Sequence, residues 1–148
     1  MELDYFKNLI WEYTRKIAES SSDLFSPAGE KYGLTMLQVR ILMCLTKCGS
    51  HTIGSLAAHT GIAGTNLSAM CKKLEGKGLI ERVRNQEDER VVKVVLTKQG
   101  MEVVSDINKC LNDKISCHLA CEPEETFRDI ILGLQKLNAL LQKMSKVE

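Results

Sequence analysis

The feature that most constrains the fold is a helix-turn-helix pattern between residues 52 and 75 of this 148-residue chain. A short helix is predicted at 52–59, because the Thr52 hydroxyl can act as its N-cap and accept from an otherwise unpaired backbone N–H. The segment Thr60-Gly61-Ile62 then turns the chain. An amphipathic helix follows at 65–75, and its apolar side consists of Leu67, Met70, Cys71 and Leu74.

A β-hairpin is predicted directly after this second helix. Gly76-Lys77-Gly78 stops the helix, and two runs rich in β-branched residues follow at 79–84 and 91–96. The polar segment 85–90 between them forms the tip of the hairpin. A helix-turn-helix followed by such a hairpin is the arrangement of a winged helix-turn-helix, in which the hairpin is the wing.

The distribution of charge points to a partner for this segment. The whole chain has a net charge of +1, which by itself does not argue for nucleic acid. Residues 63–98, however, hold eight basic and five acidic residues, whereas the segment after Met101 leans acidic. The basic excess therefore lies on the predicted helix-turn-helix and its wing, and it predicts double-stranded DNA as the partner because phosphates attract clustered Lys and Arg.

The outward side of the helix at 65–75 carries the main predicted DNA contacts. Thr65, Asn66 and Ser68 are short enough to approach base edges in a major groove, while Lys72 and Lys73 reach phosphates. Two other interpretations stay open at this stage. Ser and Thr near a helix start often cap the helix, and paired lysines are commonly a solvated helix face.

The wing supplies the remaining predicted contacts. Arg90, at the tip, is placed near the adjacent minor groove, whose narrow A·T-rich forms attract an inserted guanidinium. Arg84 and Lys93, one from each strand, complete the predicted DNA-binding set.

Long amphipathic helices are predicted at both ends of the chain. The first begins at Leu3, ends near Ser20-Ser21-Ser22 and is followed by a loop that reaches Gly33. The last opens at Pro123. Its seam has more apolar surface than a helix in contact only with solvent would carry, and consists of Phe127, Ile130, Leu134, Leu137, Leu141 and Met144. We therefore predict that the two terminal helices form the contact of a homodimer.

A helix is also predicted between the first loop and Gly49, and it contains two of the six cysteines. Its expected apolar stripe is Leu34, Leu37, Ile41, Cys44, Leu45 and Cys48. A redox switch or a metal clip is one interpretation of Cys44 and Cys48, but their place on the stripe favours a role as buried core.

Other cysteines and histidines offer ligand-type side chains without a complete site. Cys117, His118 and Cys121 lack a second ligand pair at zinc-site spacing, so a structural role is favoured. His51 and His59 flank the first helix of the motif and are expected to be polar surface residues, because no nucleophile or paired carboxylate stands beside them. We therefore expect no metal, no cofactor and no catalytic residue.

Three segments, taken in order, resemble the MarR family of transcription regulators. They are Leu74-Glu75-Gly76-Lys77-Gly78-Leu79-Ile80-Glu81-Arg82, Asp88-Glu89-Arg90 and Leu96-Thr97-Lys98-Gln99-Gly100, similar to the family's helix end, Asp-x-Arg wing and Leu-Thr-x-x-Gly helix start. The resemblance covers nearly the whole chain. It implies that Arg90 is the wing arginine, that Asp88 supports the wing through a polar contact and that the terminal helices form the dimer. The family often carries an arginine where this chain has Ala69, so the preferred DNA sequence is expected to differ.

The combined prediction is a mainly α fold with a small β-hairpin wing, that is, a winged helix-turn-helix with N- and C-terminal dimerisation helices. One compact chain would comprise an N-terminal dimerisation helix and loop (1–33), a DNA-binding lobe (34–100) and C-terminal dimerisation helices (101–148). We expect it to be cytoplasmic and not a membrane protein, because no stretch is apolar enough to span a bilayer and Met1-Glu2-Leu3-Asp4 is acidic where a secretory signal is basic.

The predicted function is that of an effector-responsive repressor, not an enzyme, which binds a palindromic operator as a homodimer. The resemblance implies a small-molecule effector in the crevice between the dimer helices and the lobe, where helix phase would place Tyr13, Met43 and Cys44. Two alternatives remain. One is a winged-helix protein-interaction module without specific DNA binding, and the other is a small metal- or thiol-dependent enzyme.

Overall fold

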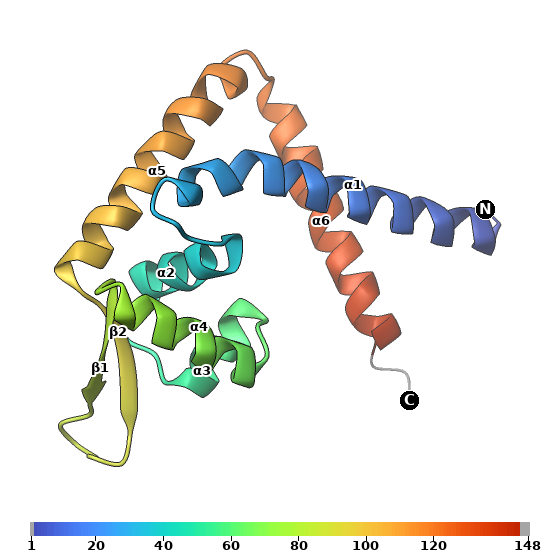
Figure 1. Ribbon diagram of the computed structural model, residues 1–148. Coiled ribbons are helices and arrows are strands. Elements are labelled where there is room, and N and C mark those ends of the chain that lie inside the picture. The colour runs from blue at the N-terminus through green and yellow to red at the C-terminus, as the bar shows by residue number, and fades with distance from the viewer. Residues whose placement is uncertain (1, 146–148) are drawn as a thin grey trace. The chain divides into compact units, whose positions relative to one another are not determined.

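A computed structural model describes residues 2–145 and contains six helices and one antiparallel hairpin in that range (Figure 1). The order is α1 (Leu3–Glu30), α2 (Met36–Cys48), α3 (Ile53–Thr60), α4 (Gly64–Gly76), β1 (Ile80–Arg84), β2 (Val92–Leu96), α5 (Lys98–Leu119) and α6 (Glu124–Ser145). The mainly α fold with a small hairpin is thus confirmed. The chain divides after Leu111 into two compact units, so α5 begins in the first unit and ends in the second.

The first unit is built on α2, α3 and α4, which contact one another, and both α2 and α4 also contact the hairpin. Its fully buried side chains come from all of these elements and from α5, and the largest are Ile41, Leu42, Leu45, Leu56, Leu67, Leu74, Ile80 and Ile107. Each such side chain contributes roughly 1.5–3 kcal/mol by leaving water. This shared core fixes the position of α4 and of the hairpin that follows it.

The helix ends of the motif are set by capping groups. Thr35 and Gln38 form a capping box at the start of α2, in which each side chain accepts from the other residue's backbone N–H. Thr52 caps α3 as predicted, because its hydroxyl accepts from the backbone N–H of Ser55 at 3.1 Å. Gly61, with φ +69°, ends α3 in the left-handed conformation that favours glycine, which confirms the predicted turn.

The hairpin has the predicted position. β1 pairs with β2 from Ile80 opposite Leu96 to Arg84 opposite Val92, and the tip projects away from the helices in Figure 1. A third short segment joins its base. The backbone N–H of His51 donates to the Val94 carbonyl at 3.1 Å, and the N–H of Val94 donates back at 2.7 Å. The α2–α3 connection is thereby tied to the base of the wing.

The predicted loop from Ser20 to Gly33 was wrong, because α1 continues through it to Glu30. Serine costs a helix only a few tenths of a kcal/mol per residue, but Pro27 inside the helix removes a backbone N–H donor and costs about 3 kcal/mol. Packing compensates for this loss at the end of the helix. Ala28 and Gly29 are buried, and a Cβ on Gly29 would lie 2.7 Å from Cγ2 of Val39 on α2.

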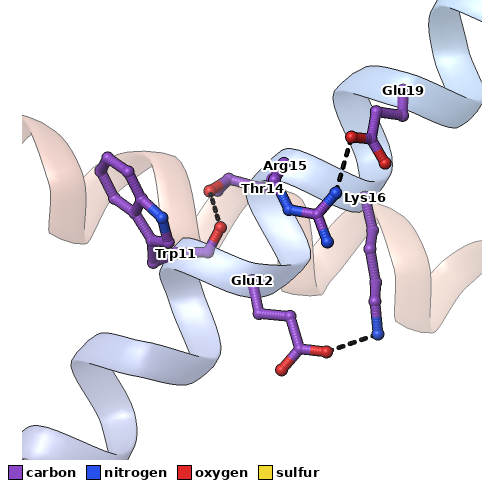
Figure 2. Close-up of polar contacts among 6 residues, drawn as sticks. All are labelled: Trp11, Glu12, Thr14, Arg15, Lys16 and Glu19. Carbon is purple, nitrogen blue, oxygen red and sulfur yellow. Dashed lines mark hydrogen bonds and ion pairs between the residues drawn. The ribbon is translucent and has the colours of Figure 1, made fainter.

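The first two-thirds of α1 is exposed, and ion pairs within the helix stabilise its polar side. Lys16 pairs with Glu12 at 2.5 Å and Arg15 with Glu19 at 2.6 Å, one helical turn apart in each case (Figure 2). The ammonium of Lys16 lowers the pKa of the Glu12 carboxyl, mainly through this hydrogen bond. Such exposed pairs support helix formation only modestly.

The predicted stripe of α2 was partly wrong in phase. The buried side chains are Gln38, Val39, Ile41, Leu42 and Leu45, whereas Leu37 and Cys48 are exposed and Cys44 is half-buried. The sequence contains apolar residues almost all around this helix, so a three-and-four spacing can be drawn through more than one face.

The second unit ends with α6, which begins directly after Pro123 as predicted. None of its side chains is buried within the described residues, and Ile130, Leu134, Leu141 and Met144 are among the exposed apolar ones. No helix among residues 2–145 is long and apolar enough to cross a membrane.

Candidate nucleic-acid interface

The outer side of α4 is a row of exposed side chains that comprises Thr65, Asn66, Ser68, Ala69, Lys72 and Lys73. The capping interpretation of Thr65, Asn66 and Ser68 was wrong. The helix begins at Gly64 with Ala63 as its N-cap, and no side chain caps it. The backbone N–H groups of its first turn are therefore left for water or for an external acceptor.

The two lysines of this row have no ion-pair partner among residues 2–145. The acid nearest in sequence, Glu75, is instead paired with Arg82 on β1, with 3.5 Å between Glu75 Oε2 and Arg82 Nε. Lys72 and Lys73 are thus available to an external anion. Ala69, which has a small side chain, lies between these lysines and the start of the helix, so the middle of the row has no lysine or arginine.

The tip of the hairpin is closed by polar contacts of two side chains. The Asp88 carboxylate accepts from the backbone N–H of Arg90 at 3.0 Å, and the Asn85 side chain accepts from the N–H of Glu87 at 3.2 Å. The N–H of Asn85 donates to the Val91 carbonyl at 2.9 Å. Asp88 therefore contacts the backbone that carries Arg90, whose own side chain is exposed.

Arg84 and Lys93 lie on opposite faces of the hairpin. Arg84 stands opposite Val92 in the ladder, and Lys93 stands opposite Val83, one position away. Because successive side chains on a strand alternate between faces, the two cations point to different sides. Arg84 is exposed and Lys93 is half-buried. Because they lie on opposite faces of the hairpin, the two side chains cannot contact the same group of an external partner.

The end of α4, the base of the wing and the start of α5 are held together by backbone and hydroxyl contacts. Gly78, with φ +71°, reverses the chain after α4, and the N–H of Leu79 returns to the Leu74 carbonyl at 3.1 Å. The Thr97 hydroxyl donates to the Gly78 carbonyl at 2.6 Å and accepts from the N–H of Gly100 at 3.0 Å. These contacts join the end of α4, the base of the wing and the start of α5 directly to one another.

The residues predicted for an effector crevice are on two helices. Tyr13 is exposed on α1, while Met43 and Cys44 are half-buried on α2. None of the three lines the pocket of the first unit that is formed by Tyr32, Lys77, Leu79, Gln99 and Val103. This pocket was not predicted, because its lining residues come from three segments that are separate in the sequence.

His51 was wrongly predicted to be a surface residue. Only 7% of its surface is exposed, and its Nδ1 lies 2.8 Å from the Ser55 hydroxyl. Its Nε2 is buried without a hydrogen-bond partner, and its ring centroid is 4.8 Å from that of the exposed His59. Burial, and to a lesser extent the neighbouring His59, lower the pKa of His51.

The cysteines divide into buried and exposed ones. The core interpretation of Cys44 and Cys48 was wrong for Cys48, which is exposed, and Cys44 is only half-buried. Cys71, on the predicted apolar side of α4, is buried. Burial raises the pKa of the thiols of Cys71 and Cys44 and so suppresses their thiolate forms. Cys117 and Cys121 are exposed. No group of three or more His, Cys, Asp or Glu residues suited to a metal ion occurs in the described part of the chain.

A comparison with protein-family models decides the class of this winged-helix arrangement. The family described as Transcriptional regulator SarA/Rot matches residues 23–107, which is more than half of the chain and includes α2, α3, α4 and the hairpin. The chain belongs to the SarA/Rot family of transcriptional regulators.

Individual relatives of this SarA/Rot-family chain agree with that assignment. The HTH-type transcriptional regulator SarZ of Staphylococcus haemolyticus is 29% identical over 86 residues, which span 58% of each chain. The uncharacterized HTH-type transcriptional regulator YfiV of Bacillus subtilis is 24% identical over 137 residues, or 93% of this chain and 86% of YfiV.

A solved structure confirms the MarR-type fold of this SarA/Rot-family chain. A mutant MarR from E. coli complexed with operator DNA superimposes with a TM-score of 0.79, and the match covers 93% of this chain and 99% of that one at 18% identity. The predicted winged helix-turn-helix of the MarR type is therefore correct. At this identity the likeness concerns the fold alone.

Proposed function

We propose that this transcription regulator binds double-stranded DNA through the outer row of α4 and through its wing. The observation that carries the proposal is that Lys72 and Lys73 are exposed beside Thr65, Asn66 and Ser68 and have no ion-pair partner among residues 2–145, on a helix whose opposite side is buried. A helix of this kind fits a major groove, where short polar side chains read base edges and lysines hold phosphates.

The wing has a complementary role in this proposal. Arg90 is exposed in the closed tip of the hairpin, from which its guanidinium can enter a narrow minor groove. Asp88 positions Arg90 through the backbone and is not itself a DNA contact. Arg84 and Lys93 contribute phosphate contacts from opposite faces of the hairpin.

The regulator is proposed to act as a homodimer, because both terminal helices carry apolar side chains that the single chain leaves exposed. Leu3, Tyr13 and Ile17 of α1 and Ile130, Leu134 and Leu141 of α6 are exposed in the single chain, with Ile17 and Leu134 about half exposed, at 48% and 51%. Together these side chains expose more apolar surface than a monomeric protein normally leaves in contact with water. A two-fold dimer would bury them and place two α4 helices on a palindromic operator.

The repressor role, the small-molecule effector near Tyr13, Met43 and Cys44, and the cytoplasmic location stay predictions of the sequence. The three-part division at residues 33 and 100 is likewise part of the proposal. We propose that the chain acts by binding and not by catalysis, in keeping with a family of transcription regulators.

Selection of bound genomic fragments tests the proposed function. The full-length protein is mixed with sheared genomic DNA, and the retained fragments are sequenced. We expect an enriched inverted repeat whose half-sites are about one helical turn, roughly 10 base pairs, apart. Retention of no fragment above background at low salt would contradict DNA binding and favour the protein-interaction alternative.

A further inference from the structure

Cys44 and Cys48 form a pair of free thiols on α2. They are four residues apart, about one helical turn, so their side chains are neighbours on the same face of the helix. Cys48 is exposed and Cys44 is half-buried. Because the pair is not enclosed in the core, it is open to a ligand from solvent.

The turn of α2 that carries this pair is held in place. The opposite side of the helix contributes Ile41, Leu42 and Leu45 to the core, and each of these residues is at most 1% exposed. The backbone N–H of Gly49 donates to the Leu45 carbonyl at 2.9 Å, so the helical hydrogen bonding continues past Cys48. The two thiols are therefore preorganised, and a ligand that bridges them does not have to order the chain first.

The spacing within the pair does not suit a disulfide. Residues four apart on an α-helix have Cβ atoms roughly 5–6 Å apart, whereas the Cβ atoms of a disulfide are about 3.5–4.5 Å apart. A single atom bonded to both sulfurs lengthens the connection, because two bonds replace one. The pair therefore favours a bridging atom over direct oxidation to a disulfide.

The surroundings of the pair limit what this bridging atom can be. Within residues 2–145 no group of three or more His, Cys, Asp or Glu residues is suited to a metal ion, so the pair does not supply the four ligands of a structural zinc site. Burial and then the neighbouring Cys48 raise the pKa of the Cys44 thiol, although Lys47 opposes them. A ligand that reacts with neutral thiols and leaves a neutral product is thus favoured over a cation held by two thiolates.

We propose that Cys44 and Cys48 together bind a monosubstituted trivalent arsenic compound, R–As(OH)2. Two As–S bonds form, two As–O bonds and two S–H bonds break, and each released proton leaves with a hydroxide as water. Arsenic stays trivalent, so the step needs no oxidant or reductant. The product is a neutral ring closed over one turn of α2. Its formation does not depend on the proposed DNA-binding function.

Capture of an arsenical by the reduced full-length protein, without DNA, tests this proposal. The probe is phenylarsine oxide, which hydrates to the R–As(OH)2 form, and intact mass is measured after addition of excess monothiol. We expect one phenylarsenic adduct per chain that the monothiol does not remove, because two sulfurs hold it as a chelate. Dithiothreitol, a competing dithiol, should remove it. Alkylation followed by peptide mapping should find Cys44 and Cys48 protected and the exposed Cys110 labelled.

Single serine variants distinguish this pair from the other thiols. Cys48→Ser changes an exposed position, so the fold is retained, and capture should weaken about 100-fold because the second bond to arsenic is lost. Cys44→Ser should have the same effect. Cys117→Ser is the matched control and should leave capture unchanged. Cys117 is also four residues from another cysteine, but Cys121 lies beyond the end of α5 and is not fixed one helical turn away.

Three results would overturn the proposal. The first is the absence of an adduct, or an adduct that the monothiol removes. The second is capture by Cys48→Ser that is as strong as capture by the unmutated protein. The third is protection of Cys117 and Cys121 in place of Cys44 and Cys48. Because DNA is absent from the measurement, each result leaves the proposed function to its own test.

Discussion

At the scale of single residues, Lys73 gives the simplest test of the proposed DNA interface. Lys73→Ala should weaken binding to all duplex sequences alike, because a phosphate contact carries no sequence information. The logarithmic salt slope of binding should flatten by about 1 for each protomer, the signature of one lost phosphate contact. Fluorescence anisotropy over a salt series measures this slope. Lys47→Ala is the matched control, and a slope that changes as much in the control would exclude a specific role for Lys73.

Arg90 should behave differently, because a guanidinium in the minor groove responds to groove width. We expect Arg90→Ala to weaken binding by about 1 kcal/mol, or roughly fivefold, on operators with A·T-rich flanks, and by less on G·C-rich ones. The measurement compares both proteins on a matched pair of operators. Unchanged affinity on both operators would mean that the hairpin is not a DNA-reading wing.

His51 makes the stability of the lobe depend on pH. Its pKa is lowered in the folded protein from the usual 6.5, mainly by burial. The neutral ring is thus favoured in the folded state, so the stabilisation is fully present above pH 6.5 and is lost as the pH falls below it. The free energy of unfolding should therefore decrease between pH 7 and 5.5, and less so in His51→Asn. Urea unfolding at several pH values measures this, and equal pH dependence in both proteins would rule out His51 as the cause.

At the scale of secondary-structure elements, the sequence predicted those elements that local signals specify. Thr52, Gly61 and the glycines after α4 mark helix ends by their chemistry, and β-branched runs mark the two strands. The end of α1 was missed because tertiary contacts decide it. Gly29 packs against Val39, and no local pattern around Pro27 reveals that contact.

In the candidate site, too, the features set by local sequence were predicted and those set by tertiary contacts were not. The exposed row of α4 followed from the spacing of its apolar residues, so Lys72 and Lys73 were predicted on the correct side. The burial of His51 was not predicted, because it depends on a bridge to Val94, more than forty residues away in the sequence. The pocket of Lys77 and Gln99 was missed for the same reason.

The seam of α6 gives a prediction at this scale. Leu134→Asp should convert the dimer into a folded monomer, because a carboxylate at a buried dimer contact loses its hydration. Ala139→Asp places the same charge on an exposed position outside the seam and should leave the dimer intact. Sedimentation velocity at micromolar concentration measures the mass. A monomeric unmutated protein that is still folded would contradict the dimer proposal.

At the scale of the whole molecule, the packing of the lobe supports the proposed DNA-binding function. The Thr97–Gly78 hydrogen bond joins the turn after α4 to the residue that follows β2, and the Glu75–Arg82 ion pair joins α4 to β1. The basic excess of this region stands out against a nearly neutral chain. A dimer of two such lobes would double every contact, which is why binding should be sensitive to salt.

The most direct test of the central claim is the affinity of the full-length protein for duplex DNA across a salt series. Lys72 and Lys73 of two protomers offer four phosphate contacts, so log K should fall linearly with log salt with a slope of about −3 to −4. Single contacts by Arg84 and Lys93 would make the slope steeper. Affinity that is absent at low salt, or that does not change with salt, would contradict the claim that the outer row of α4 and the wing form a DNA-binding surface.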